Sequence, residues 1–416
     1  MGRSCFTLRL LLLLMLPVEL FLLPASRAAA QTAAAAHSAS SPVDVALDHF
    51  RNLEHDLAQK QLQAWVAEHP NDLRALNYLA IVILQREMVR RGLLQAQVYG
   101  PQGEAFKPDR APLTPGVEKE FFSVLGKAET LAETRVKQNQ WDQEALYWAG
   151  VTHLTKALFH LTLAKAYLTA LGDAKEARSY HTRLLALNPS FVDALLVVGI
   201  YDYAVGGLPW YAKVVASLVG PRGDKARGLA EMKRVTQEGQ WAREDAKPFL
   251  AILYFREKMY PEALALLQGL TQSYPRNYLL EQEIARVYKA MGNIATAAKA
   301  YDDMLAKRAA GEPGFSAMPF AQILYQAGEV RAQLGQLDEA LRRYEQAAKL
   351  DENNLYVYRA EFEAAGLCWR LNRREDARRK YERVVRAIPE TAEGRSARQT
   401  LKRLQETRPA PSEKAK

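Results

Sequence analysis

Apolar side chains recur every three to four residues along most of this chain, and Gly, Asn and Pro interrupt the pattern at short intervals. This spacing places the apolar residues on one face of an α-helix. The strict alternation of apolar and polar residues that is typical of β-strands is almost absent. The sequence therefore predicts an all-α chain built from many short helices.

The helical pattern repeats every 34 residues in the C-terminal half of the chain. Four windows share it: 244–277, 278–311, 321–354 and 358–391. Small residues recur at positions 8 and 20 of each window, and a large residue recurs at position 24. In window order these are Ala251, Ala285, Gly328 and Ala365, then Ala263, Ala297, Ala340 and Ala377, then Leu267, Tyr301, Tyr344 and Tyr381. A single helix pair with these slots cannot bury its apolar face, so neighbouring pairs must stack on one another.

With these residues in these slots, the four windows resemble the tetratricopeptide repeat family. The resemblance implies a right-handed α-solenoid of helix–turn–helix repeats, and Gly292 falls where the turn between the two helices is expected. Lys258 takes the same slot in the first window. The family binds its ligands mainly on the concave face, which is formed by the first helix of each pair.

The N-terminal half, residues 44–243, is predicted to continue the array in a less regular form. Two inserts interrupt it, a Pro- and Gly-rich segment at 99–116 and an apolar one at 207–223. Residues Pro189–Pro275 distantly resemble the Iml2/tetratricopeptide-39 family through Gly206, Leu208-Pro209, Gly223-Asp224 and Gly228-Leu229.

The two ends of the chain do not read as parts of the folded array. Residues 1–30 combine Arg3 and Arg9, a leucine-rich run and Ala28 to Ala30, which is the pattern of a cleaved signal peptide. An uncleaved anchor is the alternative. We expect a flexible linker at 31–43, a C-terminal capping helix at 392–407 and a disordered tail at 408–416. The signal predicts export, to the periplasm or out of the cell.

A search for catalytic or metal-binding motifs finds none. His153 and His160 are seven residues apart on one predicted helix, about 10 Å along its axis, and therefore do not share one zinc ion. Cys368 is predicted to be a buried small apolar residue. We expect a protein that is not an enzyme and that has no cofactor and no metal.

The family resemblance selects candidate binding residues on the concave face. Carried onto the four windows, its ligand-facing positions include aromatic and basic side chains of the kind that anchor interfaces. They are Phe255, Arg256, Arg286, Lys289, Tyr325, Glu329, Phe362, Trp369 and Arg370. The alternative is that these residues are ordinary surface and pack against the next helix.

The apolar insert offers a second candidate surface. Its apolar side chains, among them Leu208, Trp210, Tyr211, Val215 and Leu218, would occupy most of the circumference of a helix, so it needs burial on more than one side. Either it plugs the inner groove of the solenoid, or it docks a partner helix or a bilayer surface.

The net charge of +9 is concentrated at one end of the chain. Removal of residues 1–30 leaves +7, and residues 370–408 hold thirteen basic and six acidic side chains, so most of the array is nearly neutral. This basic end either solubilises the last helices or contacts an acidic partner, anionic lipid or envelope polymer. Nucleic acid is not expected, because basic and aromatic residues do not interleave.

Together these features predict an exported, non-enzymatic scaffold that binds a protein or peptide on its concave face. The alternative is a membrane-associated factor for envelope assembly or lipid handling. That factor would use the apolar insert 208–219 and the basic C-terminal helices.

Overall fold

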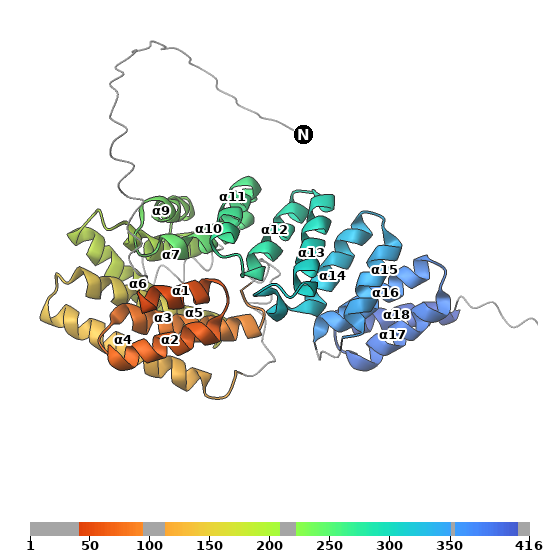
Figure 1. Cartoon of the computed structure of the whole chain (residues 1–416), viewed down its shortest axis with the longest axis horizontal. Helices are drawn as coiled ribbons and strands as arrows, with labels where there is room; N and C mark the ends of the chain where they lie inside the picture. The colour runs from red at the N-terminus through yellow and green to blue at the C-terminus, as the bar shows by residue number, and fades with distance from the viewer. Residues whose placement is uncertain (1–40, 95–112, 209–221, 351–353, 407–416) are drawn as a thin grey trace, which may run out of the picture. The chain divides into compact units, whose positions relative to one another are not determined.

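The computed structural model describes residues 41–94, 113–208, 222–350 and 354–406, and this part of the chain is helical with no β-strand (Figure 1). The predicted all-α fold is confirmed. The helices are α1 (Pro42–Arg51), α2 (His55–Glu68), α3 (Leu73–Arg90), α4 (Val117–Gln138), α5 (Gln143–Thr162), α6 (Tyr167–Leu187), α7 (Leu195–Gly206), α9 (Lys225–Glu238), α10 (Arg243–Arg256), α11 (Tyr260–Ser273), α12 (Tyr278–Ala290), α13 (Ile294–Ala309), α14 (Phe320–Gln333), α15 (Leu337–Ala348), α16 (Leu355–Arg370), α17 (Arg374–Ala387) and α18 (Ala392–Glu406). Short 3₁₀ turns precede α7 (Val192–Ala194) and α14 (Phe315–Ala317).

Consecutive helices pack in pairs, and each pair packs against the next. The first helices of successive pairs also touch, as α3 does with α5 and α14 with α16. The first helices of neighbouring pairs therefore line a common face, as a solenoid of helix pairs requires. We call the face formed by α10, α12, α14 and α16 the inner face.

The turn between the two helices of each regular pair is made in the same way in all four windows. Position 15 adopts a left-handed backbone at Lys258 (φ 60°), Gly292 (φ 80°), Gly335 (φ 75°) and Asn372 (φ 59°). The following amide then donates to the carbonyl five residues before it, as Asn293 does to Tyr288 and Gln336 to Arg331. Glycine reaches this conformation without steric cost, whereas Lys258 adopts it only because the packed helices on both sides hold it there.

The small residue at position 8 lets the two helices of a pair approach closely. The clearest case is Gly328 in α14, where an added Cβ would lie 2.6 Å from the ring of Tyr344 in α15. Tyr344 itself is almost completely buried. The small and large slots found in the sequence are thus the two sides of one packed contact.

The core runs without a break from the irregular half into the regular half. One apolar cluster extends from Val192 to Val287, across the predicted boundary at 243/244. The Asp193 carboxylate accepts hydrogen bonds from the backbone amides of Gln240, Trp241 and Ala242 and so caps the start of α10 from a distant turn. At the N-terminal end, α1 begins at Pro42 rather than at residue 44, because Ser41 accepts from the Asp44 amide and Pro42 starts the helix.

The first helix of the described chain makes a contact that the repeat pattern does not predict. The α1–α2 turn lies against the turn between α11 and α12, where Arg276 donates to Glu54 Oε1 (2.9 Å) and to Asp48 Oδ2 (2.8 Å). The Arg276 amide also donates to Asn52 Oδ1, and the Asn277 side chain donates to the carbonyl oxygen of Arg51. We call this set of bonds the closure contact.

A second set of bonds continues the closure contact toward α10. Arg51 pairs with Asp245 Oδ1 (2.9 Å), and the Tyr78 hydroxyl from α3 donates to the other oxygen of the same carboxylate. Although burial opposes the shift, the Asp245 charge raises the pKa of Arg51. Leu53, held in a left-handed conformation (φ 62°), packs against the apolar cluster of α12 to α14. The contact therefore combines ion pairs, hydrogen bonds and buried apolar surface.

We predict that Gly328→Ala lowers the free energy of unfolding by about 1–3 kcal/mol, because the new methyl group overlaps the Tyr344 ring. Gly366→Ala is the matched control. It also lies inside a first helix, but its Cβ would meet only the Tyr381 hydroxyl at 3.6 Å, so we expect no loss and a gain of up to about 1 kcal/mol from helix propensity. Urea unfolding followed by circular dichroism measures both, and equal effects of the two substitutions would contradict this packing.

We predict that Arg276→Met weakens the closure contact and lowers the free energy of unfolding by about 1–2 kcal/mol, since two carboxylates lose their shared cation. Hydrogen exchange of the α1 amides should accelerate at the same time. Arg234→Met, which removes an exposed pair with Glu238, is the control and should cost less than about 0.5 kcal/mol. Unchanged exchange in α1 would show that the contact does not hold this helix.

We predict that the contribution of Glu54 to stability disappears in acid. Burial opposes the shift, but the bonds from Arg276 and His49 lower the pKa of Glu54 below its ordinary value of 4.5. A lowered carboxyl pKa stabilises the fold above the unfolded-state value, and this stability is lost as the pH falls through the folded-state value. Glu54→Gln should therefore destabilise the chain at pH 7 and have little effect near pH 3 in urea unfolding. An equal loss at both pH values would be inconsistent with this assignment.

Candidate functional site: the inner face and a buried carboxylate

The structure places the nine predicted binding residues on the four helices of the inner face, but most of them bond to one another or to neighbouring helices. Phe255 in α10 is half-buried and contacts Tyr260, with a ring-centroid distance of 5.7 Å. The Arg286 guanidinium from α12 stacks over Phe255 and pairs with Glu283 (2.6 Å), and Arg286 is buried. Arg256 remains exposed, over the ring of Tyr203.

The predicted binding residues of α12 and α14 likewise contact other residues of the array. Lys289 from α12 and Glu329 from α14 form an ion pair of 3.0 Å across the inner face. Tyr325 is half-buried between the rings of Tyr344 and Tyr356, with centroid distances of 5.7 and 5.6 Å. These three predicted residues therefore tie neighbouring repeats together.

Helix α16, the first helix of the fourth regular pair, carries the most accessible of the predicted binding residues. Phe362 packs edge-on against Tyr381, while Trp369 is 38% exposed with the Arg374 guanidinium over its ring. Arg370 is exposed beside it. Arg256, Trp369 and Arg370 are the predicted side chains that stay available to a partner.

Glu363, also on α16, stands apart from the other carboxylates of this face. It is half-buried, yet it has no hydrogen-bond donor and no basic partner among the described residues. The carboxylates around it are paired: Glu329 with Lys289, Glu393 with Arg359 (2.9 Å), and Glu361 with Arg383 (2.9 Å). Burial raises the pKa of Glu363, and the charges of Glu329 and Glu393 raise it further.

The charge of this carboxylate acts on three tyrosines of the neighbouring helices. Burial raises the pKa of Tyr325, Tyr344 and Tyr381, and in each case the negative charge of Glu363 adds to the effect. A half-buried carboxylate without a basic partner is a favourable place for an ammonium or guanidinium group, and aromatic rings on the same face can add to that preference. Glu363 was not among the predicted residues. The sequence indicated Glu363 only by its position, one residue after Phe362, which the repeat pattern places on the ligand-binding face.

The apolar insert 207–223 is described only at its two ends, residues 207–208 and 222–223. Leu208 is half-buried and packs with Leu171 against Tyr201 and Val205. Trp210, Tyr211, Val215 and Leu218 lie outside the described residues.

Part of the basic end of the array is paired with acids. In α17, Arg378 bonds to Glu375 and Glu382, and Lys380 bonds to Glu345. This pairing reduces the free positive charge that the membrane-associated alternative would use. No helix in the described ranges has both the length and the apolar character that a membrane span requires.

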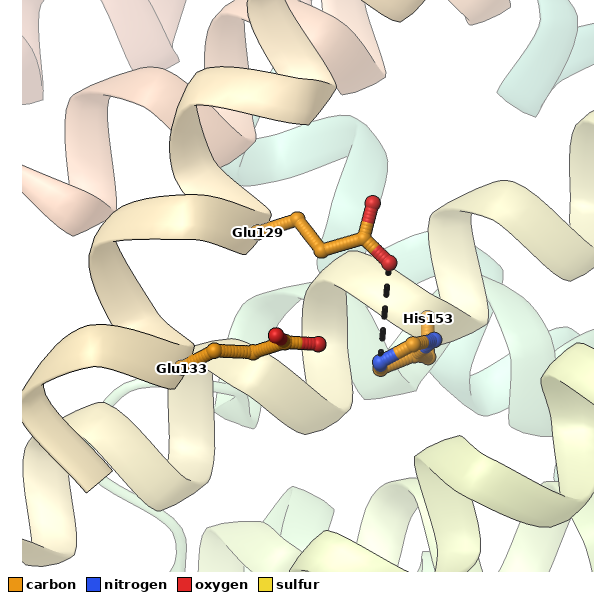
Figure 2. Close-up of side chains that lie close together, drawn as sticks. All are labelled: Glu129, Glu133 and His153. Carbon is orange, nitrogen blue, oxygen red and sulfur yellow. Dashed lines mark ion pairs between the residues drawn. The ribbon is translucent and has the colours of Figure 1, made fainter. Parts of the chain in front are cut away.

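A second group of titratable side chains lies between α4 and α5. Figure 2 shows Glu129 and Glu133, one turn apart on α4, directed toward His153 on α5. Burial lowers the pKa of His153 against the opposing charge of Glu129, which favours the neutral imidazole. Sequence reasoning missed this group because it compared His153 only with His160. His160 bonds instead to Asp173 (2.6 Å).

Cys368 is buried in α16, as predicted, and burial raises the pKa of its thiol. It is therefore a packing residue and is poorly placed to act as a nucleophile.

Comparisons with known proteins agree with the repeat pattern at one window. The sequence profile described as Tetratricopeptide repeat matches residues 321–354. No curated protein matches the chain.

Among solved structures, the chain is similar to yeast Tom70, at 12% identity over 88% of each chain with a TM-score of 0.38. It is similar to Pseudomonas aeruginosa pilF at 13% identity, over 62% of this chain and 99% of that one, with a TM-score of 0.39. Human IFIT1, solved as a dimer with m7Gppp-AAAA, matches at 13% identity over 87% of this chain and 84% of that one, with a TM-score of 0.40. Similarities this distant add nothing on function, and the resemblance to the Iml2/tetratricopeptide-39 family remains a prediction.

The matched window is also the one in which Gly328, Gly335, Ala340 and Tyr344 occupy the small, turn, small and large slots of the packed pair α14–α15. Profile, register and packing agree there, and the chain therefore contains a tetratricopeptide repeat at residues 321–354.

Proposed function

We propose that this chain is a non-enzymatic scaffold that binds a protein or peptide on its inner face, and that Glu363 receives a Lys or Arg side chain of that partner. The observation that carries the proposal is the half-buried Glu363 carboxylate, which lacks a basic partner among the described residues. Export to the periplasm or the exterior, based on residues 1–30, is part of the same proposal.

The energetics of Glu363 favour a binding role over a structural one. A carboxylate taken out of water without a partner costs free energy, and proteins normally offset that cost with a cation. The neighbouring Glu361, which is buried, has Lys380 and Arg383 within ion-pair distance. Among the described residues Glu363 has no such partner, so its charge destabilises the free chain and becomes favourable when a partner supplies the cation.

Aromatic side chains accompany Glu363 on the inner face. Tyr325 and Phe362 present aromatic rings on the same face, and Trp369 and Arg370 lie further along α16. Aromatic residues beside a desolvated charge are the usual composition of an interface hot spot. A basic side chain flanked by apolar residues fits this surface best.

We predict opposite effects of Glu363→Gln on stability and on binding. Because the pKa of Glu363 is raised, the charged form destabilises the fold at neutral pH, and the substitution should increase Tm at pH 7. Peptides of twelve residues selected by phage display on the wild-type chain should be enriched in Lys and Arg. Their affinity for Glu363→Gln, measured by fluorescence polarisation, should fall about tenfold or more.

Glu375→Gln is the matched control, since Glu375 is exposed on α17 and forms an ion pair with Arg378. It should change neither Tm nor peptide affinity. Selection of neutral or acidic peptides, or equal binding by wild type and Glu363→Gln, would overturn the assignment of Glu363.

A further inference from the structure

The group of Glu129, Glu133 and His153 has the arrangement of a metal site. The two glutamates are four residues apart on α4, so both project from one side of that helix, and α5 carries His153 opposite them (Figure 2). One ligand atom from each residue lies within 4.8 Å of the other two. A zinc ion with bonds of about 2.0–2.2 Å places tetrahedral ligand atoms about 3.4 Å apart, so small changes in the glutamate torsions bring all three into range.

His153 supplies the imidazole of this group, with Nε2 as the nitrogen that faces the glutamates. The residue is only 8% exposed, and its Nδ1 atom is buried with no hydrogen-bond partner in the described part of the chain. Its Nε2 atom faces Glu129 Oε1 at 3.9 Å, which is too long for a hydrogen bond and close to the spacing of two atoms bound to one ion. The Tyr180 ring stacks on the imidazole from α6, at 5.5 Å and 14°, and so fixes the plane in which Nε2 points.

The ammonium group of Lys156 lies beside one of the three proposed ligands. Lys156, on α5, lies 2.8 and 3.1 Å from the two oxygens of Glu129. An ion bound between the three side chains would take over one of these oxygens from the Lys156 ammonium. Lys137 is 3.6 Å from Glu133, but it is largely exposed and free to move away.

We propose that Glu129, Glu133 and His153 bind one Zn²⁺ ion in competition with the Lys156 ammonium, linking α4 to α5. One imidazole and two carboxylates suit zinc, whereas Ca²⁺ and Mg²⁺ prefer oxygen ligands alone. Three protein ligands leave a fourth position for water. This site is in the N-terminal half of the array and is independent of the proposed binding at Glu363.

The test measures Zn²⁺ binding by isothermal titration calorimetry on the full chain after removal of bound metal, with Mg²⁺ and Ca²⁺ as comparison ions. We expect one zinc site per chain that Mg²⁺ and Ca²⁺ do not compete for. Lys156→Met should tighten zinc binding about tenfold, because the competing cation is gone, and His153→Gln should weaken it about 100-fold. His160→Gln, on the same helix but bonded to Asp173, is the control and should leave the affinity unchanged.

Co²⁺ in place of Zn²⁺ supplies a second measurement, since its visible spectrum reports coordination by nitrogen and oxygen. If His153→Gln does not fold, Glu133→Gln replaces it and should also abolish the Co²⁺ spectrum. Absence of zinc binding, an unchanged zinc affinity in His153→Gln or Glu133→Gln, or no tightening in Lys156→Met would each overturn the proposal.

Discussion

The bonds from Arg276 to the α1–α2 turn are the interaction that ties the N-terminal helix to the regular repeats. It joins Arg276 to Glu54 across 222 residues of sequence, whereas the main helix contacts of the array lie between helices one or two apart in the chain. In a repeat array without such a bond, stability is a sum of local terms, and the end helices open first. The closure contact gives the first helix a second set of partners and couples its opening to α10 and α12.

The same contact explains why unfavourable local features persist. Leu53 has a left-handed backbone, which costs a residue with a large side chain about 1–2 kcal/mol. Its side chain packs against the apolar cluster of α12 to α14, and the surrounding bonds from Arg276 and Asn277 hold the turn. The strain is offset by packing and hydrogen bonds made at a distance, so it cannot be judged from the turn alone.

On the inner face, ion pairs form between adjacent repeats. The ion pairs of Lys289 with Glu329 and of Arg359 with Glu393 neutralise these charges and join adjacent repeats. Glu363 is the carboxylate of α16 that this pairing leaves out. A binding residue whose charge is unfavourable in the free chain is an instance of function maintained at a cost in stability.

The ligand-facing positions of the repeat identified the helices of the inner face, but they did not identify which side chains on those helices are accessible to a partner. They selected Arg286 and Lys289, which the fold pairs with Glu283 and Glu329, and they passed over Glu363 by one residue. A periodic rule assigns a direction to a side chain but does not show whether a neighbouring helix already supplies its partner. The group at His153 was missed for a related reason, since Glu129 belongs to a different helix.

The amino-acid sequence alone determined the all-α class, the 34-residue period, the small and large slots such as Gly328 with Tyr344, and the turn at Gly292. These features depend on residues close in the chain or one period apart, so a periodic pattern contains them. Only the tertiary structure decided the closure contact, the pairing of the inner-face charges, the isolation of Glu363 and the group at His153. Each of these depends on which distant side chains the stacked helices bring within bonding distance, and no spacing along the chain encodes that.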